Sequence, residues 1–193
     1  MQMLGLCKVV WLAGLLLLLH GCATPLDAVD QREARIAELA GQLRQLSPEV
    51  TADEAGQFAR VAVEMSAELG RKYEVKLAPW LHNASIVAGL KDRGLCYQYA
   101  WDLYESLKHV DSPHLSMYFV QANRGKLNEH HALSVTAKDA SWDTGVLLDA
   151  WRGGGNLYFG AVTDDRYPWG YEGRAVFVTA GAAVTPTATL AAP

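Results

Sequence analysis

The chain has 193 residues, of which 50% are hydrophobic and 20% are charged, and its formal net charge is −4. This length and composition fit one globular domain with enough apolar residues to build a core. The sequence contains no basic patch, which argues against nucleic acid as a partner.

Residues 1–21 are predicted to form a signal peptide. Lys8 is followed by an uncharged apolar run that leads into the sequence LHGC, which ends at Cys22. The run is short for a membrane-spanning helix of roughly 20 residues. The segment resembles a bacterial lipoprotein signal, which implies cleavage before Cys22 and lipid on its side chain. A single uncleaved membrane anchor is the alternative.

The same resemblance implies a location for the protein. Lipid on Cys22 would make a membrane its partner and place it in the cell envelope. By similarity to lipoprotein sorting in Gram-negative bacteria, Ala23 in place of Asp after the cysteine favours the outer membrane, facing the periplasm.

Cys96 is the thiol that would remain after processing, because Cys7 leaves with the signal and Cys22 carries lipid. A lone thiol in an exported protein pairs with another molecule or stays free. A free thiol is in turn either reactive or buried as a small apolar residue.

Helical periodicity extends from about residue 26 to residue 107. Residues 22–50 are expected to hold the lipid anchor and a first helix, whose apolar stripe is formed by Ile36, Leu39, Leu43 and Leu46. A second helix is expected after Thr51, because Thr51 and Glu54 fit a capping box. A third helix is expected within 82–94, and a fourth begins at Cys96.

The periodicity then changes to that of strands. The predicted strands are LSMYFVQA (115–122), HALSVTA (131–137), GVLLDAW (145–151) and NLYFGAV (156–162). Their connections are short enough for antiparallel neighbours. The predicted fold is therefore α+β: N-terminal helices, then a helix bearing Cys96 packed on an antiparallel sheet. We assign this domain to 51–178 and a disordered tail to 179–193.

The segments GLCYQYAWDL, HHALSV and GVLLDAW, in this order, resemble the core of the transglutaminase-like, papain-like cysteine enzyme superfamily. RGLC, EHHALSVTA, LLDAWR and DDRYPW are also similar to a subgroup of bacterial lipoproteins within it. The resemblance covers residues 82–169. It implies a nucleophilic Cys96, a histidine base and Asp149, which together would act on amide bonds through a thioester. The substrate would be a peptide, a protein or a cell-wall peptide, and no cofactor is implied.

The chemistry of a thiol nucleophile agrees with this order. A helix N-terminus favours a thiolate, so we predict a pKa for Cys96 below its free value of about 8.5. An imidazole would take the thiol proton, and a carboxylate would orient the imidazole.

His130 and His131 are the two candidate bases. Strand side chains alternate, so His130 shares a face with Ala132 and Ser134, which makes the more suitable floor for a cleft. The superfamily pattern of His followed by Ala would select His131 instead. A packed core histidine is the third possibility.

Asp149 is the preferred carboxylate, because it follows an apolar run on the strand next to the histidines. It could also be a turn or cap residue. Asp143, Asp164 and Asp165 lie in turn-like sequence, where solvated or turn-forming roles are expected. On this basis Asp149→Asn should keep the fold.

An acyl-thioester mechanism also needs hydrogen-bond donors for the oxyanion. The backbone N–H of Cys96 is one candidate, and the side chain of Asn83 is the other, with His82 next. Asn83 could equally cap the helix that it precedes.

Other features receive weaker interpretations. Trp101, Trp151, Tyr158 and Trp169 could line a cleft or pack in the core. RGGGN and DDRYPWGYEG are interpreted as flexible rims beside the site. A zinc site is disfavoured, because the adjacent His130 and His131 would point to opposite faces of a strand. A noncatalytic lipoprotein that uses this fold for binding or assembly is the alternative to an enzyme.

Overall fold

The structure, a computed structural model, describes residues 25–73, 93–126 and 128–178. The signal peptide, Cys22, Asn83 and the C-terminal tail all lie outside these residues, as does the helix expected within 82–94 apart from Arg93 and Gly94, which are not helical. The chain divides into two units, 1–34 and 35–193. The first unit contributes only residues 25–34, the opening turns of one helix, and every other described residue belongs to the second unit.

The described part of the chain is α+β, as predicted. Its α-helices are α2 (Pro25–Leu46), α3 (Ala52–Lys72) and α5 (Cys96–Leu107). None of the helices in the described ranges combines the length and the apolar character needed to cross a membrane.

One antiparallel sheet follows the helices. Its strands are β1 (Leu115–Ala122), β2 (His130–Ala137), β3 (Val146–Asp149), β4 (Tyr158–Ala161) and β5 (Trp169–Ala175). They lie in the order β4-β3-β2-β1-β5. The first four match the predicted strands and form a meander of sequence neighbours, whereas β5 was not predicted. It pairs with β1, so the chain crosses from one edge of the sheet to the other between β4 and β5.

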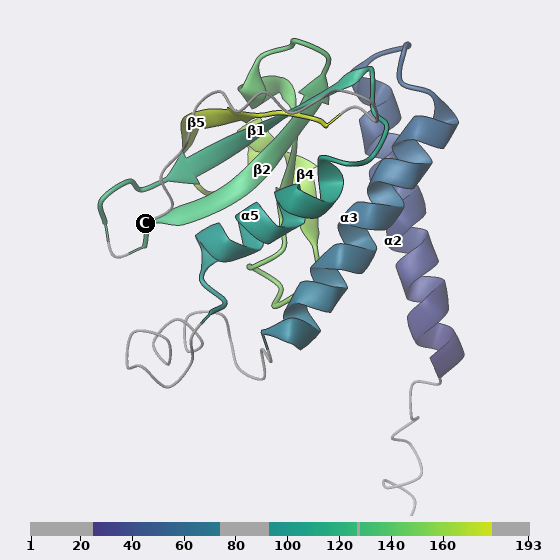
Figure 1. The fold of residues 1–193 in the computed structure, drawn as a ribbon, viewed down its shortest axis with the longest axis horizontal. Helices are drawn as coiled ribbons and strands as arrows, with labels where there is room; N and C mark the ends of the chain where they lie inside the picture. Colours follow the sequence, from purple (N-terminus) through teal and green to yellow (C-terminus); the bar gives the residue numbers. More distant parts are fainter. Residues whose placement is uncertain (1–24, 74–92, 127, 179–193) are drawn as a thin grey trace, which may run out of the picture. The chain divides into compact units, whose positions relative to one another are not determined.

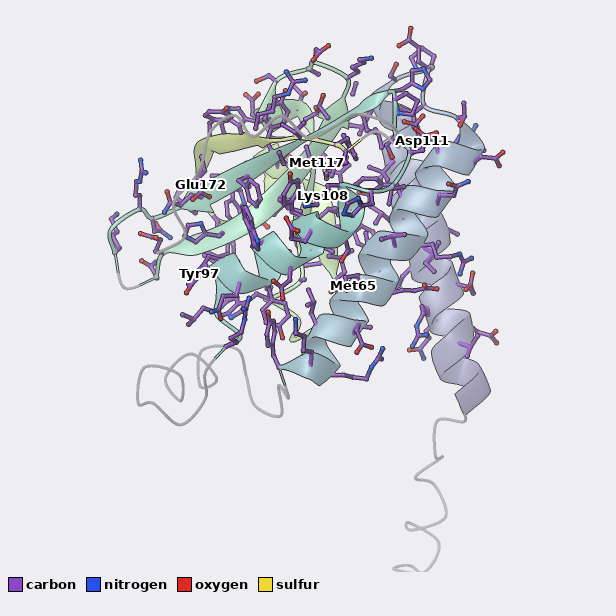
Figure 2. The ribbon with its side chains drawn as sticks, in the orientation of Figure 1. Met65, Tyr97, Lys108, Asp111, Met117 and Glu172 are labelled. Atoms are coloured by element: carbon purple, nitrogen blue, oxygen red, sulfur yellow. The ribbon has the colours of Figure 1, made fainter. Side chains whose placement is uncertain are left out.

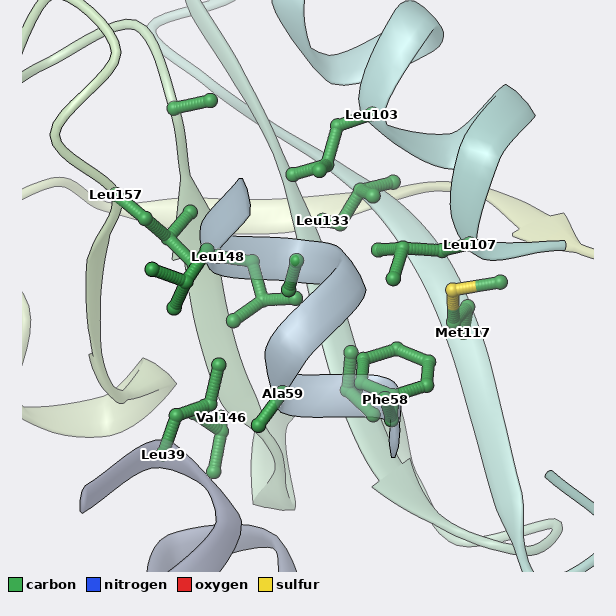
Figure 3. Close-up of a cluster of buried hydrophobic side chains, with 14 of the residues drawn as sticks. Leu39, Phe58, Ala59, Leu103, Leu107, Met117, Leu133, Val146, Leu148 and Leu157 are labelled. Atoms are coloured by element: carbon green, nitrogen blue, oxygen red, sulfur yellow. The ribbon is translucent and has the colours of Figure 1, made fainter. Parts of the chain in front are cut away.

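The main core lies between the helices and one face of the sheet. Figure 1 shows α5 along β2, with α3 beside α5. Phe58, Leu103 and Leu133 are fully buried there and come from α3, α5 and β2. Figure 3 shows these side chains with Leu39 of α2 in the same cluster. Residues before the expected domain start at 51 therefore belong to this core.

The other face of the sheet has a smaller cluster. Val120, Ala132 and Leu147 are buried there, together with Val162 from the connection that leads toward β5. Leu133 and Val135 belong to the helix-facing core, so β2 directs alternate side chains to opposite faces, as predicted. His130 falls on the face of Ala132.

The predicted capping box at the start of α3 is half correct. Thr51 Oγ1 accepts a hydrogen bond from Glu54 N at 3.1 Å, which confirms the N-cap. The buried side chain of Glu54 accepts instead from the backbone N–H of His114 at 2.9 Å, and its second oxygen lies 2.9 Å from His114 Nδ1. Glu54 thus ties α3 to the chain just before β1.

The glycine-rich turn after β3 is packed, and the expectation of a flexible rim was wrong for it. Ser66 Oγ on α3 donates a buried hydrogen bond to Gly155 O at 2.9 Å. A Cβ on Gly70 would lie 2.5 Å from Gly154 O and 2.9 Å from Gly155 Cα. Glycines on both sides therefore let the turn approach the backbone of α3 closely.

Candidate active site

His130 and Asp149 form a buried pair at one end of the sheet. His130 Nε2 lies 2.6 Å from Asp149 Oδ2, and the two side chains are 2% and 1% exposed. Both residues lie on adjacent strands and share the face of Ala132. Because a carboxylate accepts, the hydrogen on this imidazole belongs on Nε2, which leaves Nδ1 with a lone pair. Nδ1 is buried and has no hydrogen-bond partner within the described part of the chain.

Three further hydrogen bonds fix the carboxylate of Asp149. Its Oδ1 accepts from the backbone N–H groups of Trp151 at 3.1 Å and Arg152 at 3.0 Å. Its Oδ2 accepts from Arg152 Nε at 3.0 Å as well as from His130. The turn after β3 therefore folds back on the carboxylate and determines where it points.

Asp165 holds the other side of Arg152. Arg152 Nη1 lies 2.7 Å and Nη2 3.2 Å from the two oxygens of Asp165, whose side chain is 1% exposed. Burial opposes ionisation of Asp165, but the hydrogen bonds and charge of Arg152 and the N–H of Tyr167 hold its pKa below the ordinary value. Of the two roles expected for Asp165, the solvated one was therefore wrong, because the side chain is buried in the ion pair with Arg152, whereas the turn-forming one is confirmed by the hydrogen bond from Tyr167 N at 2.9 Å.

Aromatic rings enclose the imidazole of His130. The ring centroids of Trp151, Tyr167 and Trp169 lie 4.8, 4.8 and 5.4 Å from that of His130. Trp169 opens β5, so the segment expected to be a flexible rim contributes a wall of the site. Its indole Nε1 donates to Asp165 at 3.1 Å.

Cys96 opens α5 and reaches the start of β2. The residue is 7% exposed, and its sulfur lies 3.8 Å from the carbonyl oxygen of Glu129. The backbone N–H of His131 also forms a hydrogen bond with the sulfur, which favours the thiolate. These two groups flank His130 in sequence, so the thiol lies beside the backbone of the residue that carries the imidazole. No hydrogen bond joins the sulfur to Nδ1 of His130.

The predicted low pKa of Cys96 was wrong. Burial raises the pKa of the thiol to about 11, and the charge of Asp149 adds to the effect. The backbone N–H groups of His131 and Tyr97 favour the thiolate but do not offset the burial. Cys96 is therefore a neutral thiol at pH 7.

The raised pKa of Cys96 should make the stability of the protein depend on pH. Between pH 9, close to the pKa of a free thiol, and pH 11, close to the pKa of Cys96, the folded chain keeps a proton that the unfolded chain has lost. The contribution of Cys96 to the free energy of unfolding is therefore constant below pH 9. It decreases as the pH rises, by roughly 2–3 kcal/mol at pH 11. We expect wild type to lose this much relative to Cys96→Ser between pH 8 and pH 11 in urea denaturation. Equal pH profiles for the two proteins would contradict it.

His131, the alternative base, is held away from Asp149. Its Nδ1 lies 3.0 Å from Glu172 Oε2 and its Nε2 lies 3.0 Å from Glu129 Oε1. Burial works against the charge, but the two carboxylates raise the pKa of His131. Figure 2 shows Glu172 and Tyr97, which contacts the His131 ring, at the same end of the molecule. The carboxylate expected to orient the base thus meets His130.

The start of α5 contributes hydrogen-bond donors. Gln98 Oε1 accepts from the N–H groups of Gly94 and Leu95, at 2.6 and 3.0 Å, and so secures the chain that enters the helix. The first N–H groups of a helix have no acceptor within the helix, and the backbone N–H of Cys96 lies close enough to the sulfur of the same residue to favour the thiolate. Within the described ranges, no three His, Cys, Asp or Glu side chains are arranged to hold a metal ion.

Comparison of the chain with protein-family models, with curated proteins and with solved structures found no match.

Proposed function

We propose that this protein is a thiol hydrolase or acyltransferase that acts on amide bonds, with Cys96 as nucleophile, His130 as base and Asp149 as the residue that orients the base. The observation that carries the proposal is the buried His130–Asp149 pair at 2.6 Å, with an unpartnered Nδ1 on the side of the ring away from the carboxylate. The resemblance to the transglutaminase-like, papain-like superfamily agrees with it.

A neutral thiol defines how such a site would work. The sulfur would attack the carbonyl carbon while its proton moves to Nδ1, and Asp149 would stabilise the imidazolium. The leaving amine would take the proton from Nδ1, which leaves a thioester on Cys96. Water would then release an acid, or an amine would form a new amide. Sulfur and Nδ1 must come within hydrogen-bond distance for this step, and such contacts are often long until substrate binds.

Covalent acylation tests the proposal. We expect p-nitrophenyl acetate to acetylate Cys96 of the folded protein, with intact mass and peptide mapping as the readout and Cys96→Ser as the blank. His130→Ala should slow acetylation about 100-fold or more, because general base catalysis contributes that much. His131→Ala is the matched control on the same strand and should stay within about twofold of wild type.

Two results would reject the enzyme. In one, His130→Ala is acetylated as fast as wild type at equal folded fraction. In the other, acetylation of wild type is no faster than its unfolding, as measured in urea, so that only the unfolded chain reacts. If His130→Ala does not fold, His130→Gln, which fills more of the imidazole volume, replaces it.

A noncatalytic binding or assembly module is the second candidate. The raised pKa of Cys96, its burial and the aromatic rings packed on His130 favour this alternative, since all three suit a core. If the acetylation experiment rejects the enzyme, the binding or assembly module becomes the proposed function.

We also propose that the mature chain begins at a lipidated Cys22 in the cell envelope, at the outer membrane facing the periplasm. The sequence LHGC after an apolar run supports this. Mass spectrometry of the N-terminal peptide should find diacylglycerol and a third acyl chain on Cys22. An unmodified Cys22 would contradict it.

A further inference from the structure

The charges around His130 form a chain of four groups. His130 bonds Asp149, Asp149 bonds Arg152, and Arg152 bonds Asp165. Burial opposes the charge of Arg152, but the hydrogen bonds and charges of Asp165 and Asp149 hold its pKa above the ordinary value. Asp149 is therefore already neutralised by Arg152. Without Asp165, an imidazolium at His130 would gain little net attraction from the pair.

Asp165 changes that balance. Two carboxylates and one guanidinium leave one net negative charge beside the imidazole, and a proton on His130 makes the cluster neutral. A buried charge is tolerated when it is paired and hydrogen-bonded, and both carboxylates meet this condition here. Asp165 thus supplies the charge that an imidazolium at this site needs.

Asp165 also holds two of the rings around the imidazole. Its Oδ1 accepts from the backbone N–H of Tyr167 at 2.9 Å and from Trp169 Nε1 at 3.1 Å. Both rings pack on His130. The guanidinium of Arg152 lies 3.9 Å from the ring centre of Tyr158, which fixes the chain from another side.

We infer that Asp165 is a positioning residue for His130, which acts through Arg152 by balancing the charge of the imidazolium and through Tyr167 and Trp169 by holding the rings against the imidazole. The kinetic part of this inference rests on the proposed function, whereas the structural part stands without it.

Asp165→Asn tests the inference, with Asp164→Asn as the matched control. Asp164 is the neighbouring exposed carboxylate, and it accepts a hydrogen bond from Thr163. In Asp165→Asn, proton NMR should show an upfield shift of the His130 Nε2–H signal and at least about tenfold faster exchange of the Trp169 indole N–H. Acetylation of Cys96 should fall about 10- to 100-fold, by analogy with the loss seen when the hydrogen-bond partner of a metal-ligating side chain is removed. Asp164→Asn should leave all three readouts at the wild-type level.

The acetylation and NMR measurements distinguish failure of the proposed function from failure of the inference about Asp165. If wild type shows no His130-dependent acetylation, the proposed function fails, and the two NMR readouts still decide the role of Asp165. Unchanged signals and unchanged acetylation in Asp165→Asn overturn the inference. A fall in acetylation with both NMR signals unchanged also overturns it, because Asp165 would then act without positioning His130.

Arg152→Lys keeps the test decisive if Asp165→Asn does not fold. The ammonium preserves the positive charge but cannot bridge two carboxylates with a planar fork. We expect about tenfold slower acetylation and a shifted His130 Nε2–H signal in this variant. Wild-type values for both in folded Arg152→Lys overturn the inference.

Discussion

Asp149→Asn should destabilise the protein by about 3–5 kcal/mol, because the change removes one partner of a buried ion pair. The carboxylate accepts four hydrogen bonds and is 1% exposed. An amide can accept with one end only, so its NH₂ group must face either the two backbone donors or His130 and Arg152. Guanidinium denaturation with an unchanged m-value would measure the loss.

Asp143→Asn provides the control for this change. Asp143 lies in the exposed turn before β3, where its carboxylate accepts a hydrogen bond from Ser141 Oγ. A surface substitution of this kind should change stability by no more than about 0.5 kcal/mol. A loss below about 1 kcal/mol in Asp149→Asn would show that the carboxylate is not held as an ion. The sequence predicts that Asp149→Asn keeps its fold, and the bonds from Asp149 to the turn add the prediction that this fold is less stable.

Gly70→Ala should destabilise the protein by about 1–3 kcal/mol, although alanine is normally the better helix residue. The added Cβ would lie 2.5 Å from Gly154 O, and backbone on both sides prevents relief. The turn that carries Arg152 would have to move away from α3. Thermal and urea denaturation would measure the change.

Gly56→Ala is the matched control in the same helix. A Cβ at Gly56 would meet nothing within 4 Å, so the ordinary helix propensity applies. We expect this variant to be more stable than wild type by about 0.5–1 kcal/mol. Opposite signs for the two glycines would establish the close approach, and stabilisation by both would refute it.

Much of the fold is predictable from local pattern. Alternating apolar residues, and the short apolar run in β3, locate β1 to β4, and Thr51 marks the start of α3. The strand β5, with the sequence WGYEGRA, was missed because its two glycines and its charges leave no alternating apolar pattern. It becomes a strand through pairing with β1, which is a tertiary effect.

The site was predictable in part for the same reason. Alternation along β2 favoured His130, and Asp149 follows from its place at the end of the adjacent strand. The bond between Arg152 and Asp165 joins two turns, and nothing in either turn indicates the other. The pKa of Cys96 depends on how closely α5 packs on β2, and burial of this kind outweighs the helix N-terminus that the sequence reveals.

The two edge strands of the sheet, β4 and β5, affect the tendency of the chain to aggregate. An open sheet edge offers unpaired N–H and C=O groups to another copy of the chain. Here β4 has only four residues, and the pairing of β5 with β1 shifts register between Phe119 and Val120. Exposed Glu172 and Arg174 add charge of both signs along β5. The short edge strand β4 and the irregular, charged edge strand β5 both disfavour edge-to-edge aggregation of neighbouring molecules. This protection matters most where chains are crowded on a surface.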